Sequence, residues 1–245
     1  MPLIPRPRSL LLALWLALAS ACTSLPNNSA ISAGAPAPTE PAQIAVDPPS
    51  SDEWTRDMAR FHAEDAATPP PRDAYVFTGS SSVRMWQTLK SDFPGKPILN
   101  RGFGGSQVRD AVHYADQVAI GYAPRKILIY SGDNDINAGR SPQQVLQDFR
   151  AFVARVRQGL PETPIAYLAI KPSPSRADQL ARQQAANALV KAEATKLHKV
   201  EFIDVATPML GADGQPKPEL FLEDRLHMNR QGYELWQDLV APYLD

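Results

Sequence analysis

Residues 74–82 read Ala-Tyr-Val-Phe-Thr-Gly-Ser-Ser-Ser, an apolar run followed directly by a glycine and three serines. Aromatic and β-branched residues favour strands, so Ala74–Thr78 is predicted to be a buried strand, and Gly79 permits a sharp turn after it. Four other runs have the same character, the first of them weaker than the rest: Pro97–Asn100, Lys126–Tyr130, Pro164–Ile170 and Val200–Val205.

Helical patterns separate these runs. Trp54, Met58 and Phe61 recur at helical spacing and predict a short helix, which Pro69–Pro71 end. Ser141 suits a helix cap with Pro142 in the first turn. The other helical patterns are Val83–Lys90, Gln107–Val118, Pro142–Gln158, Arg176–His198 and Gln231–Leu239. Strands alternating with helices predict a parallel sheet covered on both faces, a flavodoxin-like three-layer α/β/α sandwich with strand order 2-1-3-4-5.

Composition excludes several classes of protein. The 25 Lys and Arg residues nearly balance the 26 Asp and Glu residues, which argues against a nucleic-acid partner. The single cysteine excludes an internal disulfide, a thiolate-rich zinc site and a cysteine-ligated iron–sulfur cluster. Proline is abundant, and 12 of the 24 prolines lie at or before Pro71, so the two ends of the chain differ in character.

The N-terminal segment has the pattern of an export signal. Arg6 and Arg8 precede the uncharged run Leu10–Ala21, which is too short for a bilayer core that needs about 20 residues. The run ends in Leu18–Cys22, which resembles the lipobox of bacterial lipoproteins, where the cysteine is diacylated and becomes the new N-terminus. This resemblance implies an exported protein anchored in a membrane and facing the periplasm. Because the cysteine is followed by Thr23 and not by Asp, the resemblance favours the outer membrane over the inner membrane.

Residues 23–51 combine prolines with Ala, Ser, Asn and Thr and show no apolar periodicity. Such a stretch buries too little apolar surface to offset the entropy of ordering it, and it predicts a tether. We therefore expect a signal peptide over residues 1–21, an acylated Cys22 with a disordered linker to residue 51, and a folded domain over residues 52–245.

Polar motifs follow the predicted strands, and ligands of open α/β sheets bind at the carboxyl ends of strands. The four motifs are Gly79–Ser82, Asn100–Ser106, Gly132–Asp135 and Asp224–His227. Each motif alone is weak evidence for a catalytic site. All four in this order describe acyl transfer to a serine.

The chemistry of that reaction explains the residue types. A serine hydroxyl needs a base, which His227 can provide, and Asp224 can fix the imidazole tautomer and stabilise the imidazolium. Attack on a carbonyl creates an oxyanion that requires preorganised donors. The backbone N–H of Gly105, the side-chain amide of Asn134 and the backbone N–H of Ser81 are the expected donors.

The body of the chain resembles the SGNH hydrolases, also called the GDSL-like lipase/acylhydrolase or esterase family. Their first block, Gly-Asp-Ser, appears here as Gly79-Ser80-Ser81 and places the nucleophile at Ser81. Ser80 departs from the family's Asp, so Ser81 is chosen over Ser80 and Ser82 by its offset from Gly79. A variant of this block with three serines, running here to Trp86, is familiar in bacterial members.

The remaining blocks of the family also match in order. Gly105 corresponds to the oxyanion glycine, Gly132–Asp135 matches Gly-x-Asn-Asp and gives Asn134, and Asp-x-x-His gives Asp224 and His227. The resemblance covers most of residues 74–243 and implies the same flavodoxin-like fold. It also implies a hydrolase of carboxylic esters, with acetylated glycans, short acyl esters or lysophospholipids among its substrates.

Other residues have less specific roles. Asp135 and Arg176 are possible cleft residues. For Asp135 the favoured role is to order its loop by hydrogen bonds, and the alternative for Arg176 is a capped, solvated helix start. No His, Asp or Glu set has metal-ligand spacing, and the reaction requires neither metal nor cofactor. No long apolar insertion separates the blocks, which favours short acyl groups. Two alternatives are a non-catalytic lipoprotein that binds glycan in the same cleft and an FMN binder that uses Gly79–Ser82, which would leave Asp224 and His227 without a role.

Overall fold

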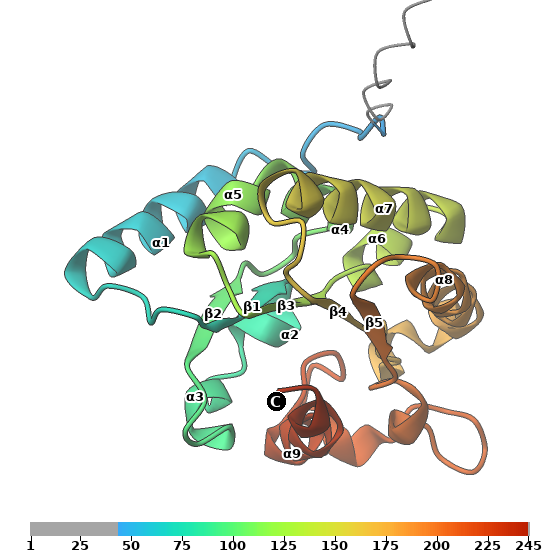
Figure 1. Cartoon of the computed structure of the whole chain (residues 1–245). Helices are drawn as coiled ribbons and strands as arrows, with labels where there is room; N and C mark the ends of the chain where they lie inside the picture. The colour runs from blue at the N-terminus through green and yellow to red at the C-terminus, as the bar shows by residue number, and fades with distance from the viewer. Residues whose placement is uncertain (1–43, 245) are drawn as a thin grey trace, which may run out of the picture. The chain divides into compact units, whose positions relative to one another are not determined.

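The computed structural model describes residues 44–244 (Figure 1). The predicted signal peptide, Cys22 and the greater part of the predicted linker lie outside these residues. Within the described range, the helices are too short or too polar for any of them to cross a bilayer.

A five-stranded sheet forms the centre of the domain, and all of its strand pairs are parallel. The strands are β1 (Tyr75–Gly79), β2 (Ile98–Gly102), β3 (Lys126–Tyr130), β4 (Ile165–Leu168) and β5 (Val200–Ile203). Their order is β2-β1-β3-β4-β5, so the flavodoxin-like topology expected from the sequence is confirmed.

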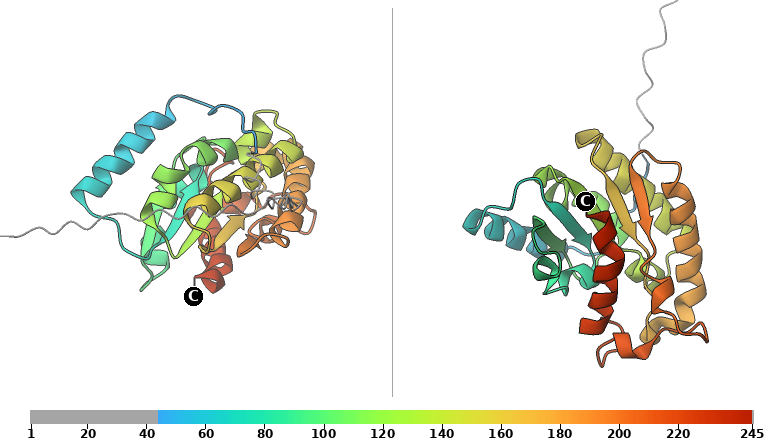
Figure 2. Two further views of the ribbon diagram at one scale, coloured as in Figure 1. Left: turned by 45° about the horizontal axis from the view of Figure 1, so that its top comes forward. Right: turned by 60° about the horizontal axis from the view of Figure 1, so that its bottom comes forward.

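Helices cover both faces of the sheet, as Figures 1 and 2 show. Ile127 and Ile129 of β3 are buried on the first face against residues of α1, α4, α5, α7 and α8. Leu128 and Tyr130 are buried on the second face against residues of α2, α3 and α9. This alternation follows from the two-residue period of a strand. The helices are α1 (Trp54–Ala67), α2 (Ser81–Arg84), α3 (Leu89–Asp92), α4 (Val108–His113), α5 (Ala115–Val118), α6 (Asp133–Asn137), α7 (Pro142–Gly159), α8 (Leu180–Ala194) and α9 (Arg230–Val240).

Several helices differ from their predicted bounds. The cap of α7 is confirmed, because Ser141 accepts a hydrogen bond from the backbone N–H of Gln144 and Pro142 begins the helix. The patterns Val83–Lys90 and Gln107–Val118 each form two short helices instead of one. The helix expected from Arg176 is wrong at both ends: it begins at Leu180, after a 3₁₀ turn (Pro174–Gln179), and it stops at Ala194. Arg176 itself has non-helical backbone angles, and its side chain is engaged elsewhere.

The last residues before α1 contact the domain. Asp47 pairs with Arg140 at 2.7 Å. Ser50 donates its backbone N–H and its hydroxyl to the two carboxylate oxygens of Asp110, at 2.6 and 2.5 Å. The end of the predicted linker is therefore held against α4 and the start of α7.

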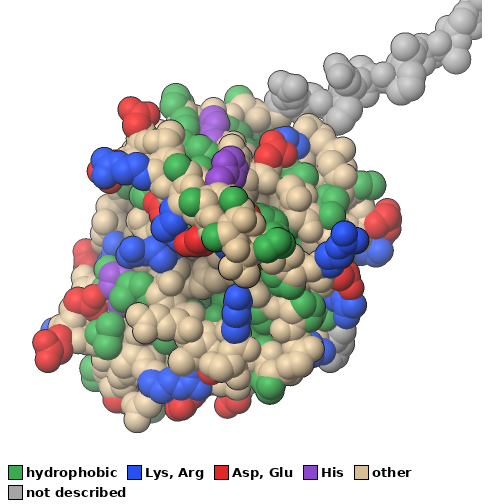
Figure 3. Space-filling model, turned by 90° about the vertical axis from the view of Figure 1, so that its left-hand side faces the viewer, with side chains coloured by type: hydrophobic (Ala, Val, Ile, Leu, Met, Phe, Trp, Pro, Cys, Tyr) green, Lys and Arg blue, Asp and Glu red, His purple; other side chains and the backbone are tan. Residues whose placement is uncertain are grey.

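The surface carries mixed charges. On the face in Figure 3, Lys and Arg side chains lie among Asp and Glu side chains, in keeping with the balanced composition. Within residues 44–244 the exposed large apolar side chains are Ile44 and Leu222. They are far apart in the sequence and do not indicate a broad apolar surface.

Candidate active site

The end of β1 places Ser81. Gly79 has a φ of +110°, and a Cβ atom there would lie 1.9 Å from the carbonyl oxygen of Tyr130, so no side chain fits. The next residue, Ser80, donates its backbone N–H to that same oxygen at 2.9 Å. The chain therefore turns tightly against the end of β3, and Ser81 becomes the first residue of α2.

Ser81, His227 and Asp224 form a continuous chain of hydrogen bonds. The Oγ of Ser81 lies 3.0 Å from Nε2 of His227, and Nδ1 of His227 lies 2.6 Å from Oδ2 of Asp224. An ionised carboxylate can only accept, so Nδ1 carries a proton and donates it to Asp224. In the neutral ring Nε2 is then an acceptor, and it receives the hydroxyl proton of Ser81.

Asp224 is also bonded to its own loop. Its Oδ1 accepts the backbone N–H groups of Leu226 and His227, each at 2.9 Å. Partial burial opposes ionisation, but these bonds and the bond from the His227 ring lower the pKa of Asp224 to about 2. Asp224 is therefore ionised at neutral pH and can stabilise an imidazolium.

The three expected oxyanion donors have hydrogen-bonding capacity to spare. The backbone N–H groups of Ser81 and Gly105 donate to no residue that the structure describes. The Nδ2 of Asn134 donates one proton to the carbonyl oxygen of Ser106 at 3.0 Å, which leaves its second proton free. These free donors are what an oxyanion requires.

Arg176 fixes the direction of the Asn134 amide. Both terminal guanidinium nitrogens of Arg176 lie 3.3 Å from Oδ1 of Asn134, and one of them lies 2.8 Å from the carboxylate of Asp133. Because an arginine only donates, Oδ1 must face it, and the NH₂ group must face Ser106. From the sequence, Arg176 is either a cleft residue or part of a solvated helix start. In the structure its side chain is largely buried and is ion-paired with Asp133 beside Asn134.

Asp135 is buried completely, so the prediction that it is a cleft residue is wrong, because it has no surface open to a cleft. It accepts the backbone N–H of Val108 at 3.1 and 3.2 Å, and Arg140 lies 3.8 Å away. Burial raises the pKa of Asp135 to about 7. Asp135 thus ties α6 to the start of α4, behind the loop that carries Gly105.

Lys171 was not singled out from the sequence, yet it holds the loop that carries His227. Its side chain is 1% exposed, and its ammonium donates to the carbonyl oxygen of Leu226 at 2.8 Å. Ser175 adds a backbone N–H bond to the carbonyl oxygen of Arg225 at 3.0 Å. Burial lowers the pKa of Lys171, while the nearby carboxylate of Asp133 opposes this. The sequence signal that could have identified Lys171 is a lysine directly after a run predicted to be a buried strand.

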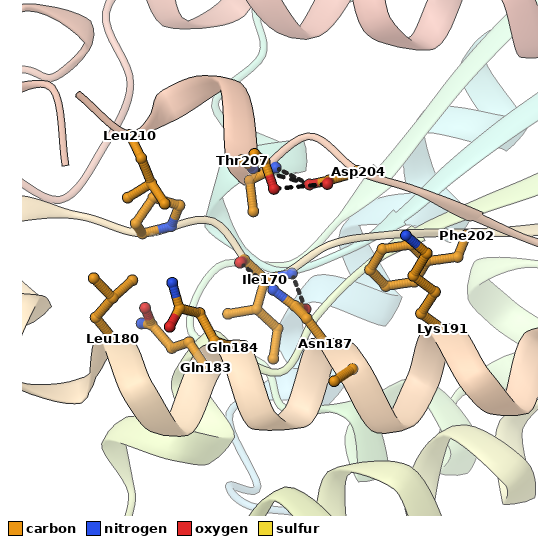
Figure 4. A pocket seen from close by; sticks show the side chains of 13 residues that line it. Ile170, Leu180, Gln183, Gln184, Asn187, Lys191, Phe202, Asp204, Thr207 and Leu210 are labelled. Carbon is orange, nitrogen blue, oxygen red and sulfur yellow. Dashed lines mark hydrogen bonds between the residues drawn. The ribbon is translucent and has the colours of Figure 1, made fainter. Parts of the chain in front are cut away.

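An apolar hollow of about 150 Å³ lies between α8 and the segment after β5 (Figure 4). Asn187 holds the backbone of Ile170 there, and Asp204 accepts hydrogen bonds from Thr207. None of the hydrogen-bonded catalytic candidates lines this hollow. Residues 44–244 also contain no cluster of His, Cys, Asp and Glu that could hold a metal ion.

Comparisons with known proteins agree with the fold. The profile of the GDSL-like Lipase/Acylhydrolase family matches residues 45–235. Subunit alpha2 of platelet-activating factor acetylhydrolase IB from Rattus norvegicus is 25% identical over 204 residues, which span 80% of this chain and 86% of the relative. A solved structure of a GDSL-like lipase from Bacteroides thetaiotaomicron has a TM-score of 0.67 at 20% identity. It covers 76% of this chain and 96% of its own.

A second solved structure, described as a platelet activating factor from Streptococcus pneumoniae, has a TM-score of 0.70 at 25% identity. It covers 79% of this chain and 93% of its own. The family profile spans well over half of the sequence and includes most of the hydrogen-bonded site. The chain therefore belongs to the GDSL-like Lipase/Acylhydrolase family of ester-bond hydrolases.

Proposed function

We propose that this chain is a serine esterase that removes short acyl groups from glycan or lipid alcohols at the bacterial cell envelope. The observation that carries the proposal is the pair of distances from Ser81 to His227 and from His227 to Asp224, 3.0 and 2.6 Å. This arrangement activates a serine for attack on an ester carbonyl.

The reaction proceeds in two halves. His227 takes the hydroxyl proton as the Oγ of Ser81 attacks the carbonyl carbon, and the resulting oxyanion accepts hydrogen bonds from Ser81 N–H, Gly105 N–H and Asn134. His227 then gives its proton to the leaving alcohol, which departs and leaves an acyl-serine. Water, deprotonated by His227, attacks this ester, and collapse of the second oxyanion releases the acid and restores Ser81.

A short acyl group is favoured by two observations. The curated relatives at 25% identity are named acetylhydrolases. The described chain from β1 to α9 also contains no long apolar insertion between the motif-bearing loops. Acetyl is therefore the acyl group that we propose first.

The envelope location rests on the sequence of the leader. Lipid attachment at Cys22 is supported by Arg6 and Arg8, the apolar run Leu10–Ala21 and the lipobox-like Leu18–Cys22. Thr23, in place of Asp after the cysteine, favours the outer membrane. Cys22→Ala is expected to abolish incorporation of radiolabelled palmitate in a bacterial host. Undiminished labelling of that variant would exclude Cys22 as the attachment site.

Activity on p-nitrophenyl acetate tests the proposal. Ser81→Ala should lower kcat/KM by at least about 10³-fold and abolish labelling by a fluorophosphonate, because within residues 44–244 no other hydroxyl is bonded to His227. Ser80→Ala is the matched control, since the Ser80 side chain caps no helix and should leave both readouts nearly unchanged. Full activity of Ser81→Ala would overturn the assignment. A folded wild type that neither turns over esters nor reacts with the probe would favour a non-catalytic glycan-binding protein.

A further inference from the structure

Arg84 is an exposed arginine next to the site. Arg84 makes no side-chain hydrogen bond and no ion pair with any residue in the described part of the chain. Two arginines of the domain with largely buried guanidinium groups are instead paired with carboxylates: Arg140 lies 2.5 Å from Asp148, and Arg176 lies 2.8 Å from Asp133. The guanidinium of Arg84 is therefore free to bind an anion from outside the protein.

Arg84 lies on the same side of α2 as the nucleophile. It follows Ser81 by three residues within the short helix Ser81–Arg84. Residues three apart on a helix are neighbours, with Cβ atoms about 5–6 Å apart. A substrate bonded to Ser81 therefore extends within reach of an arginine side chain on this turn.

The side chain of Arg84 packs against the loop that carries the oxyanion glycine. A Cβ atom on Gly104 would lie 2.4 Å from Nε of Arg84 and 2.7 Å from its Cζ. The absence of a side chain at Gly104 thus makes room for the guanidinium, directly beside Gly105. Both Arg84 and Gly105 are exposed, so the guanidinium lies on the solvent-facing side of the loop that carries Gly104 and Gly105.

The exposed charges on the loop that carries His227 are mainly negative, in contrast to the positive charge of Arg84. Glu223 and Asp224 are exposed beside His227. Arg225 is exposed as well, but it follows these two carboxylates directly, and they offset its attraction for an anion. An anionic substrate is therefore repelled from the Asp224 side and drawn toward Arg84.

We propose that Arg84 binds a carboxylate or phosphate on the alcohol part of the ester, so that the preferred substrates are short acyl esters of anionic alcohols. This inference rests on the proposed esterase function. An acetyl group, the acyl group proposed first, has no ionisable group, which places the anion on the alcohol. Guanidinium binds both carboxylate and phosphate through paired N–H donors.

The test compares two acetate esters of similar shape, anionic 4-acetoxybenzoate and neutral 4-acetoxybenzamide, in the wild type and in variants of the full chain. Arg84→Gln should lower kcat/KM for the anionic ester by about threefold to tenfold, as expected for a partly exposed ion pair, and leave the neutral ester within about twofold. Arg84→Lys should keep part of the preference. Added NaCl should narrow the difference between wild type and Arg84→Gln.

Arg72→Gln is the matched control, because Arg72 is exposed, has no described partner and precedes β1 at the opposite end of the sheet. It should change neither ester. Equal losses on both esters in Arg84→Gln would mean that Arg84 only supports the Gly104 loop, and no loss would mean that it binds no substrate anion. A selective loss in Arg225→Gln instead would place the anion at the other loop. A wild type inactive on both esters would contradict the proposed function itself.

Discussion

The nucleophile side and the acid–base side of the site are held in place by different means. Ser81 is placed by close backbone packing, because Gly79 lies against the carbonyl of Tyr130 where two neighbouring strands end. The loop with Asp224 and His227 contains no regular helix or strand apart from an isolated bridge between Phe221 and Met228. Its backbone carbonyls are instead held by donors from the segment after β4.

The difference shows how rigid and adjustable parts are combined in one site. Backbone packing at a strand end leaves little freedom, since a displacement there would disturb the sheet itself. The loop depends on hydrogen bonds from the Lys171 ammonium, which a side-chain substitution can remove, and from the backbone N–H of Ser175. Changes on the nucleophile side should therefore affect folding, whereas changes on the acid–base side should affect mainly the rate.

Gly79→Ala should have the largest effect and tests the packing on the nucleophile side. The new methyl group would overlap the carbonyl of Tyr130 at a φ of +110°, so the free energy of unfolding should fall by about 3 kcal/mol or more. Urea denaturation measures this change. Gly95→Ala is the control: its φ is +78°, but no atom lies within 4 Å of the added methyl, and it should lose about 1 kcal/mol. Equal losses would show that backbone strain alone, without the close approach, explains both variants.

Lys171→Met should have an intermediate effect and tests the hydrogen bonds on the acid–base side. Without the ammonium, the carbonyl of Leu226 loses its donor, and His227 is held less precisely against Ser81. We expect kcat on p-nitrophenyl acetate to fall by about 10- to 100-fold, with a smaller change in KM and a similar melting temperature. Lys217→Met removes an ammonium that donates to the carbonyl of Pro208 at 2.9 Å, and it should leave kcat unchanged. A large loss of stability with no specific loss of kcat would contradict the positioning role of Lys171.

Asp224→Asn should have a small effect on stability and tests what the charge of Asp224 adds to that loop. The pKa of Asp224 is lowered from 3.8 to about 2, so its ionised form stabilises the folded state above about pH 4. That stabilisation is lost as pH falls toward 2. The difference in unfolding free energy between wild type and Asp224→Asn should therefore shrink between about pH 5 and pH 3. The carboxylate is half exposed and screened by solvent, so the whole effect should stay below about 1 kcal/mol.

Urea denaturation across that pH range measures the effect. Asp238→Asn is the control, because the Asp238 carboxylate accepts no hydrogen bond from a described residue, and its difference from wild type should stay level. A difference for Asp224→Asn that is independent of pH would show that shape, and not charge, links Asp224 to its loop.

Much of the architecture could be predicted from the sequence. Buried parallel strands are apolar runs, and each of the five predicted runs overlaps an observed strand. The helix breaks were harder to predict, because residues 176–179 have helix-forming neighbours and no strong stop signal. Arg176 leaves the helical conformation while its side chain pairs with Asp133 and contacts Asn134. These contacts join parts of the chain that are about 42 residues apart, and local preferences do not reveal them.

The sequence by itself determined the fold class, the strand order and the residue types of the candidate site, because apolar periodicity and the order of the four motifs are local properties. From the sequence, Ser81 could be chosen as the nucleophile over Ser80 and Ser82 only by its offset from Gly79. Only the tertiary structure decided which hydroxyl faces His227, a partner 146 residues away, and which buried groups hold that pair. The physical reason is that such distances depend on how the strand ends pack together. The contact of Gly79 with the carbonyl of Tyr130 positions Ser81, and the hydrogen bond from Lys171 positions the loop of His227.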